Sequence, residues 1–314
     1  MEFMFLIVAI IAYVTKGICG KKTSFYVKTN NDSYLFNGTR MLICVFVGLI
    51  FIISQSQTYE MIRVDGALLL IYLISGLATA MMTFSWVLSV QKGAMVFVDT
   101  FMLLSTVIPI VGSAIFYHEA IRINQIIGFV ILLLAVIMMA VYNNCLQREK
   151  LHYSTWSIFL LTFLGAGFMS FSQKMYTNYA LRNHFEPCAN VFNFYTYFVS
   201  SILFVIAYIA TRPRTSVKIS TEEVRCRLSL QKINFIKSFK YIFLMSLLLF
   251  VNSYMMIKAS VLEAAIIYPM QYGLNLILMT FAAFFFFHEK PRGISVCASF
   301  LALIGLLIMN LHIF

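Results

Sequence analysis

The stretch FYHEAIR at residues 116–122 returns as FFHEKPR at residues 286–292. In both copies a His-Glu pair is followed by Arg three residues after the Glu, and the offset from His118 to His288 is 170 residues. At the same offset, residues 94–142 align with 264–312 without a gap. Because only 11% of the chain is charged, three matched polar positions at one offset indicate an internal repeat.

A second and weaker echo supports the same division of the chain. The tripeptide LFN at residues 35–37 corresponds to VFN at residues 191–193. We therefore predict two halves, residues 1–150 and residues 151–314.

Composition places the repeat in a membrane. The 314 residues are 61% hydrophobic, with a mean hydropathy of +0.88, which is far above the range of water-soluble domains. Period-two alternation is absent, so the apolar runs predict helices long enough to cross a bilayer. The ten predicted spans are residues 2–20, 35–54, 66–90, 94–117, 121–142, 153–175, 188–210, 240–258, 263–287 and 292–313. The predicted fold class is an all-α membrane protein with ten transmembrane helices.

Five spans in each half make the repeat an inverted one. Because five is odd, the second half enters the membrane from the side opposite to the first. Many secondary transporters are built in this way.

The net charge of +11 is interpreted as a topology signal and not as a nucleic-acid interface. Loops after odd-numbered spans, with their flanks, hold 18 of the 23 Lys and Arg residues. The positive-inside rule then places both termini outside and the basic segment 212–240 in the cytoplasm. That segment is either a solvated linker or an amphipathic helix lying on anionic lipid.

The sequence predicts no metal and no cofactor. The six cysteines show no C-x-x-C spacing. The repeated motif has Arg where a metallopeptidase H-E-x-x-H motif needs a second His. A Walker motif for nucleotide binding is also missing.

With these features the chain resembles the drug/metabolite transporter superfamily, in particular its ten-helix, EamA-like branch. The resemblance rests on the five-plus-five layout, on Glu119 and Glu289 at the last turn of each half, and on Lys16 and Arg40. It implies a transporter in the cytoplasmic membrane of a prokaryote. The family often has Gly before the turn Glu, where this chain has His, and its members usually have cytoplasmic termini.

The two His-Glu-x-x-Arg motifs are interpreted as structural turns or gating hinges. A Glu at the turn accepts hydrogen bonds from the free N–H groups that open the next helix, and the following Arg pairs with it. The residues assigned to these turns are His118, Glu119, Arg122, His288, Glu289 and Arg292.

The substrate site is predicted near the membrane midplane between the two halves. Polar side chains at i, i+3, i+4 and i+7 mark one face of the ninth span. The predicted cavity residues are Trp86, Asp99, Gln173, Asn252, Tyr254, Tyr268, Gln271, Tyr272 and Asn275. Taken singly, each side chain has the alternative of an interhelical hydrogen bond.

Three ionisable side chains are candidates for coupling. Asp99 lies inside the fourth span and is either a proton-exchanging or substrate-binding carboxylate, a static partner of a Lys, or a solvated group near the start of the helix. Lys16 and Lys174 occupy comparable places in the two halves. They either bind a carboxylate substrate or extend to the interface, and the second is the preferred interpretation.

The predicted function is secondary transport of a small metabolite, such as an amino acid or amine, by alternating access. The alternative is an intramembrane enzyme or a non-transporting assembly factor, although the twelve Asp and Glu residues are dispersed and not clustered for catalysis. Expected partners are the substrate, membrane lipid and protons but no nucleic acid, and the chain is expected to be a monomer or homodimer.

Overall fold

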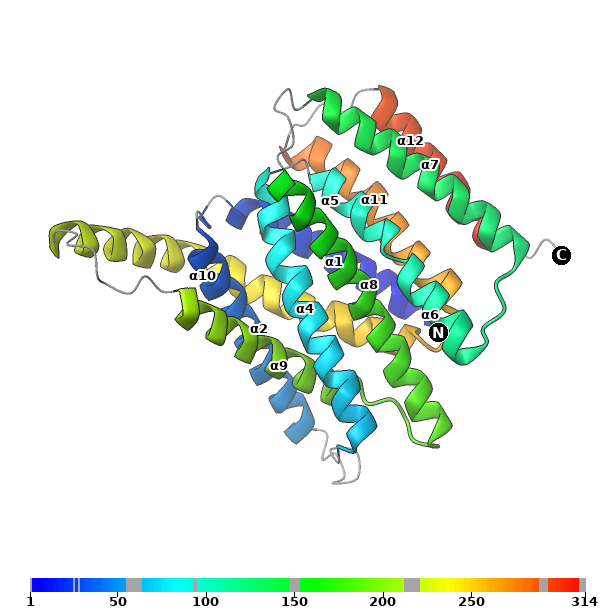
Figure 1. Cartoon of the computed structure of the whole chain (residues 1–314), viewed down its shortest axis with the longest axis horizontal. Coiled ribbons are helices and arrows are strands. Elements are labelled where there is room, and N and C mark those ends of the chain that lie inside the picture. The colour runs from blue at the N-terminus through cyan, green and yellow to red at the C-terminus, as the bar shows by residue number, and fades with distance from the viewer. Residues whose placement is uncertain are drawn as a thin grey trace.

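The computed structural model describes residues 2–24, 26–27, 29–54, 64–92, 95–146, 153–211, 221–287 and 293–310, and over these residues the fold contains helices and no strand. Figure 1 shows the helices packed into a bundle. Their bounds are α1 (Glu2–Ser24), α2 (Asn30–Ser54), α4 (Gly66–Lys92), α5 (Met95–Leu104), α6 (Val107–Tyr117), α7 (Ile123–Leu146), α8 (Tyr153–Arg182), α9 (Ala189–Thr211), α10 (Thr221–Ala259), α11 (Ala264–Phe287) and α12 (Gly293–Asn310).

These helices form the ten predicted spans in the predicted order. Within the described residues, seven helices are long and apolar enough to cross a membrane, and three shorter apolar segments cover the fourth, fifth and tenth spans. Helices α5 and α6 together make the fourth span. The prediction of an all-α membrane protein is confirmed.

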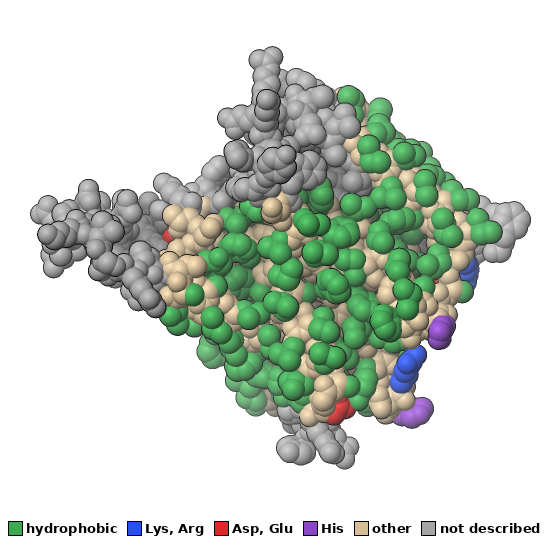
Figure 2. Space-filling model, in the orientation of Figure 1, with side chains coloured by type: hydrophobic (Ala, Val, Ile, Leu, Met, Phe, Trp, Pro, Cys, Tyr) green, Lys and Arg blue, Asp and Glu red, His purple; other side chains and the backbone are tan. Residues whose placement is uncertain are grey.

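The distribution of side chains is that of a protein in lipid. Figure 2 shows hydrophobic side chains over most of one face, with the few charged ones near its edge. Large apolar side chains such as Ile53 and Ile123 are exposed, at 70% and 77%, whereas Lys16, Arg40 and Asp99 are buried. Exposed apolar and buried polar side chains are expected when the surrounding solvent is hydrocarbon.

The helix contacts repeat with an approximate two-fold symmetry. Helix α4 packs on α8 as its counterpart α10 packs on α1, and α4 packs on α9 as α10 packs on α2. Helices α2 and α9 pack on each other, as do α7 and α12, which lie side by side in Figure 1. Each of these last two pairs joins a helix to its own repeat equivalent, so the symmetry axis passes between them.

The paired equivalents are antiparallel. In α2 and α9, Gly38 approaches Phe204 while Gly48 approaches Phe194. In α7 and α12, Gly128 approaches Met309 while Leu132 approaches Gly305. A two-fold axis that relates antiparallel transmembrane helices lies in the membrane plane, which is the geometry of an inverted repeat.

The fourth span is interrupted, where the sequence predicted one helix over 94–117. Pro109 has no N–H and its ring crowds the carbonyl four residues earlier, so the chain turns at Ser105 and Thr106. The hydroxyl of Ser105 donates to the carbonyl of Met102 at 2.6 Å, and that of Thr106 donates to Leu103 at 2.8 Å. The Leu103 carbonyl also accepts the backbone N–H of Thr106 at 3.1 Å, so both carbonyls have donors at the break, as a broken transmembrane helix requires.

The described part of the basic segment 212–240 is a helix and not the linker that one interpretation predicted. From Thr221 onward it is helical and continues without a break into the eighth span, so that α10 runs from Thr221 to Ala259. The early, yellow-green part of α10 projects beyond the bundle in Figure 1. No Gly or Pro lies between Thr221 and Ala259 to stop the helix. Residues 212–220 lie outside the described part of the chain.

Candidate substrate site and its closed face

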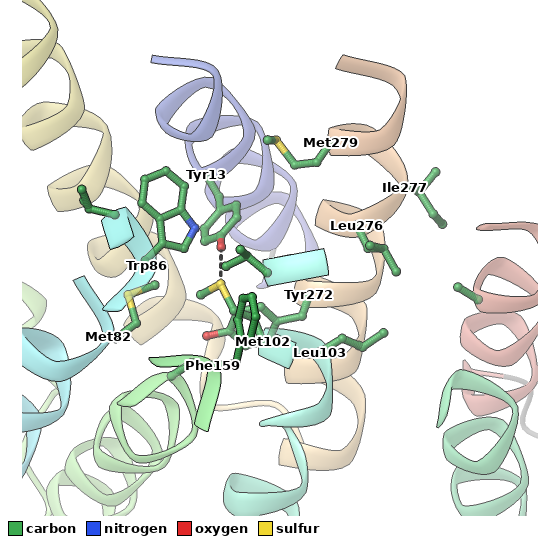
Figure 3. Packing of buried hydrophobic residues seen from close by; sticks show 14 of the residues in the cluster. Tyr13, Met82, Trp86, Met102, Leu103, Phe159, Tyr272, Leu276, Ile277 and Met279 are labelled. Atoms are coloured by element: carbon green, nitrogen blue, oxygen red, sulfur yellow. Dashed lines mark hydrogen bonds between the residues drawn. The ribbon is translucent and has the colours of Figure 1, made fainter. Parts of the chain in front are cut away.

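A buried carboxylate on α5 has one oxygen without a partner among the described residues. Asp99 on α5 is 3% exposed, and its Oδ1 accepts a hydrogen bond from the Tyr13 hydroxyl of α1 at 3.4 Å. Its Oδ2 has no hydrogen-bond partner among the described residues. The Tyr13 hydroxyl also lies 2.8 Å from the sulfur of Met102, the contact drawn as a dashed line in Figure 3.

Aromatic side chains surround this carboxylate. The ring of Tyr272 on α11 meets Tyr13 edge to face, with centroids 6.4 Å apart, and its hydroxyl lies 3.1 Å from that of Ser170 on α8. Figure 3 shows Trp86 of α4 beside Tyr13. The indole N–H of Trp86 is buried, and the described residues offer it no acceptor.

The polar face predicted on the ninth span points into the bundle. The Tyr268 hydroxyl donates to the carbonyl of Ser170 at 2.7 Å. Gln271 and Asn275 are 3% and 1% exposed. Both the oxygen and the nitrogen of the Asn275 amide lack partners in the described part of the chain. A buried amide without partners is costly, which marks this position for a ligand or water.

The remaining predicted cavity residues have other surroundings. Gln173 donates to the hydroxyl of Ser253 at 3.3 Å, and that hydroxyl donates to Asn193 at 2.6 Å. Asn252 donates to the carbonyl of Ala9 at 2.8 Å and so joins α10 to α1, the interhelical alternative. Tyr254 packs against a separate apolar cluster that includes Tyr72 and Tyr176, and we do not include it in the candidate site.

Two buried cations belong to the centre, and the preferred interpretation of Lys16 as an interfacial residue is wrong. Lys16 is 4% exposed, its ammonium lies 4.2 Å from the centroid of the Tyr13 ring, and it is within electrostatic range of Arg40 and Asp99. The side chain cannot reach water because it starts on the inner face of α1, one turn from Tyr13.

Arg40 was not assigned to the site from the sequence. It is 2% exposed, and its Nη1 donates to the Asn37 side chain at 3.0 Å. Its Nε has no acceptor among the residues described. The signal was present, because Asn37 belongs to the repeated tripeptide LFN and lies one helical turn before Arg40.

Lys174 does not extend to the interface either. Its ammonium lies 2.6 Å from Oε1 of Glu119 and donates to the carbonyls of Ser260 and Leu262 at 3.2 and 2.7 Å. The side-chain hydroxyls of Thr177 and Ser260 lie 2.5 Å apart one turn further along α8. A counter-ion and two carbonyls within the protein hold this lysine at 2% exposure.

The first His-Glu-x-x-Arg motif forms a turn that binds a helix start, as predicted in kind. Glu119 Oε2 accepts the backbone N–H of Ala264, the first residue of α11, whereas the prediction named the helix next in sequence, which is α7. Arg122 lies 3.8 Å from Glu263, whereas the prediction paired it with the turn Glu. Together these contacts join α6, α8 and α11 at one end of the bundle, which we call the closed face.

His118 stands where the family often has Gly, and its backbone conformation accounts for that preference. It caps α6 in the left-handed conformation, with φ of 57° and ψ of 33°, and its N–H donates to the carbonyl of Ser113. Glycine favours this conformation because it has no Cβ. The second motif, with His288, Glu289 and Arg292, lies outside the described residues.

A groove of about 530 Å³ opens on the side of the bundle, beside the closed face. Apolar side chains of α11 and α12 form most of its wall, and Arg122, Asn124 and Gln125 lie at its α7 end. It is lined by none of the predicted cavity residues.

Ten spans, an apolar exterior and a buried polar interior define an integral, multi-pass membrane protein. Residues 1–141 match the EamA-like transporter family of the drug/metabolite transporter superfamily, which confirms the resemblance over that part of the chain. Members of this family carry small molecules across membranes.

Solved structures extend the likeness in fold to the whole chain. One crystal structure superposes with a TM-score of 0.69 at 13% identity and covers 98% of this chain and 97% of that one. At this identity the likeness concerns the fold alone. No curated protein matches the sequence.

Proposed function

We propose that this protein is a secondary transporter that moves a small metabolite by alternating access. The observation that carries the proposal is the difference in surroundings between two buried lysines at comparable places in the two halves. Lys174 lies in an ion pair with Glu119 at the closed face, whereas Lys16, in the comparable place of the first half, lies over the Tyr13 ring.

In an inverted repeat, such a difference has a place in the transport cycle. We interpret the different contacts of Lys16 and Lys174 as two conformations of two halves that have a similar fold. Exchange of these conformations between the halves opens the closed face and closes the opposite one. The site around Asp99 lies between helices of both halves, since α1 and α5 belong to the first and α8 and α11 to the second.

Asp99 is the proposed proton-coupling group. Its carboxylate is buried, bonded on one oxygen to a phenol and unpartnered on the other within the described structure. A buried carboxylate with one free oxygen offers a place where a proton can bind and leave during the transport cycle. We assign the protein, as part of the proposal, to the cytoplasmic membrane of a prokaryote.

The family match favours transport over the alternatives of an intramembrane enzyme or an assembly factor, because EamA-like proteins are transporters.

Solute uptake by proteoliposomes tests the proposal. Liposomes containing the purified protein are loaded with one unlabelled amino acid, amine or carboxylate at a time and mixed with its labelled form. We expect counterflow of at least one class of solute, and faster net uptake when an inward proton gradient is imposed. Protein-free liposomes are the control. Uptake that matches the control for every class would contradict the proposal.

A further inference from the structure

The buried charges of the bundle do not balance. Among the described residues, the buried Lys, Arg, Asp and Glu side chains are Lys16, Arg40, Lys174 and Asp99, and with their ordinary charges they sum to an excess of positive charge. Lys174 has its own counter-ion in Glu119, whose side chain is 21% exposed. Within the described part of the chain, Lys16 and Arg40 therefore have Asp99 as their one buried acidic neighbour, which leaves one positive charge in excess among these three side chains. A buried charge without a counter-ion is costly, so this group of side chains favours the binding of an anion.

The hydrogen-bond inventory leads to the same conclusion. Arg40 uses Nη1 on Asn37, but its buried Nε donates to no described residue. The N–H of Trp86 and the amide of Asn275 are also unpartnered in the described structure. Lys16 contacts the face of an aromatic ring, and no carboxylate of the described chain lies within ion-pair distance of its ammonium. These donors come from four helices, α1, α2, α4 and α11.

We propose that the transported metabolite is a small organic anion with a flat, aromatic body. Its oxyanion is balanced by Lys16 and Arg40, and its ring lies among Tyr13, Trp86 and Tyr272. This assignment rests on the proposed transport function and narrows its substrate class. A cationic amine would add a second excess charge to the same site, whereas an anion cancels the first.

Three probes of one shape and three charges test the assignment: benzoate, benzamide and benzylamine. Each is added to the purified full-length protein in lipid nanodiscs, and thermal unfolding is followed. We expect benzoate to raise the midpoint in a concentration-dependent way and the other two to leave it unchanged, because a ligand stabilises the state that it binds. Stabilisation by benzylamine, or by none of the three probes, would overturn the proposal.

Removal of one cation provides a second test, in which one of the two readouts needs no probe. In Lys16→Met, one buried Arg remains opposite one buried Asp, so we expect the protein without ligand to melt at the same temperature or higher. The affinity for benzoate should fall by about thirtyfold or more. Lys22→Met, the same change at an exposed position of α1, is the matched control and should alter neither quantity. A strongly lowered melting temperature in Lys16→Met would instead identify Lys16 as the fixed partner of Asp99.

The transport proposal is tested separately in the same liposomes. Uptake of a neutral or cationic metabolite by protein that ignores benzoate would overturn the anion assignment and leave transport standing. Benzoate binding without uptake of any solute would support the anion site and contradict transport.

Discussion

Lys174 of α8 and Glu119 of the α6–α7 turn form an ion pair of 2.6 Å, and the same carboxylate accepts the N–H that opens α11. The lysine side chain is 3% exposed and the glutamate side chain 21%. The two partners are therefore unequal, because the glutamate can regain water when the pair is broken and the lysine cannot.

This inequality predicts an order of stabilities. Glu119→Gln leaves a buried ammonium without a counter-ion and should lower the free energy of unfolding by about 2–4 kcal/mol. Lys174→Met leaves a hydrated carboxylate that still binds Ala264, and it should cost about 1 kcal/mol. The double variant should be more stable than Glu119→Gln alone. Thermal melts of the four proteins measure this order, and equal melting temperatures for the two single variants would refute it.

The left-handed cap of α6 predicts a stabilising change. His118→Gly removes the Cβ strain at φ of 57° and should add about 1 kcal/mol to the stability. His118→Ala keeps the Cβ and is the matched control, for which we expect no gain. If alanine stabilises as much as glycine, the effect belongs to the loss of the imidazole and not to the backbone.

Two buried asparagines separate substrate contacts from helix contacts. Asn252 bonds the carbonyl of Ala9, so Asn252→Ala should lower stability by about 1 kcal/mol or more. Asn275 bonds no described residue, and Gln271 lies on the same face of α11. Asn275→Ala and Gln271→Ala should therefore weaken transport while the melting temperature stays nearly constant. Losses of transport that only follow losses of stability would make all three residues structural.

Asp99 predicts the pH dependence of transport. Asp99→Asn keeps the shape of the side chain but can neither bind nor release a proton. The variant should lose the acceleration by a proton gradient and keep counterflow, which requires no net proton movement. The measurement is uptake at several external pH values in matched liposomes. An unchanged pH profile in the variant would remove Asp99 from the coupling step.

The sequence predicted the spans because lipid imposes length and apolarity on each helix. The inverted repeat was inferred from a different signal, the recurrence of His-Glu-x-x-Arg at an offset of 170 residues with five spans in each half. The break in the fourth span could not be predicted from Pro109 alone, because Pro269 lies inside α11 and leaves that helix continuous. The continuous helix α10 was predictable, because no Gly or Pro lies between Thr221 and Ala259.

The partners of Lys16 and Lys174 could not be predicted from the sequence. A lysine near the end of a span usually extends toward the headgroups, and only the packing of α1 and α8 shows that these two face inward. The Lys174–Glu119 contact joins the two halves of the chain, and no local pattern encodes such a pair. Only the three-dimensional structure shows that Arg40 Nε and the Asn275 amide have no hydrogen-bond partner among the described residues.

The most direct test of alternating access is a reversible lock on the closed face. The hydroxyls of Thr177 and Ser260 lie 2.5 Å apart, so Thr177→Cys with Ser260→Cys places two sulfurs within bonding reach. Transport of the double variant is measured before oxidation, after oxidation and after reduction, with oxidised Thr177→Cys alone as the control. Alternating access predicts that oxidation stops transport and that reduction restores it. Undiminished transport by quantitatively cross-linked protein would contradict it.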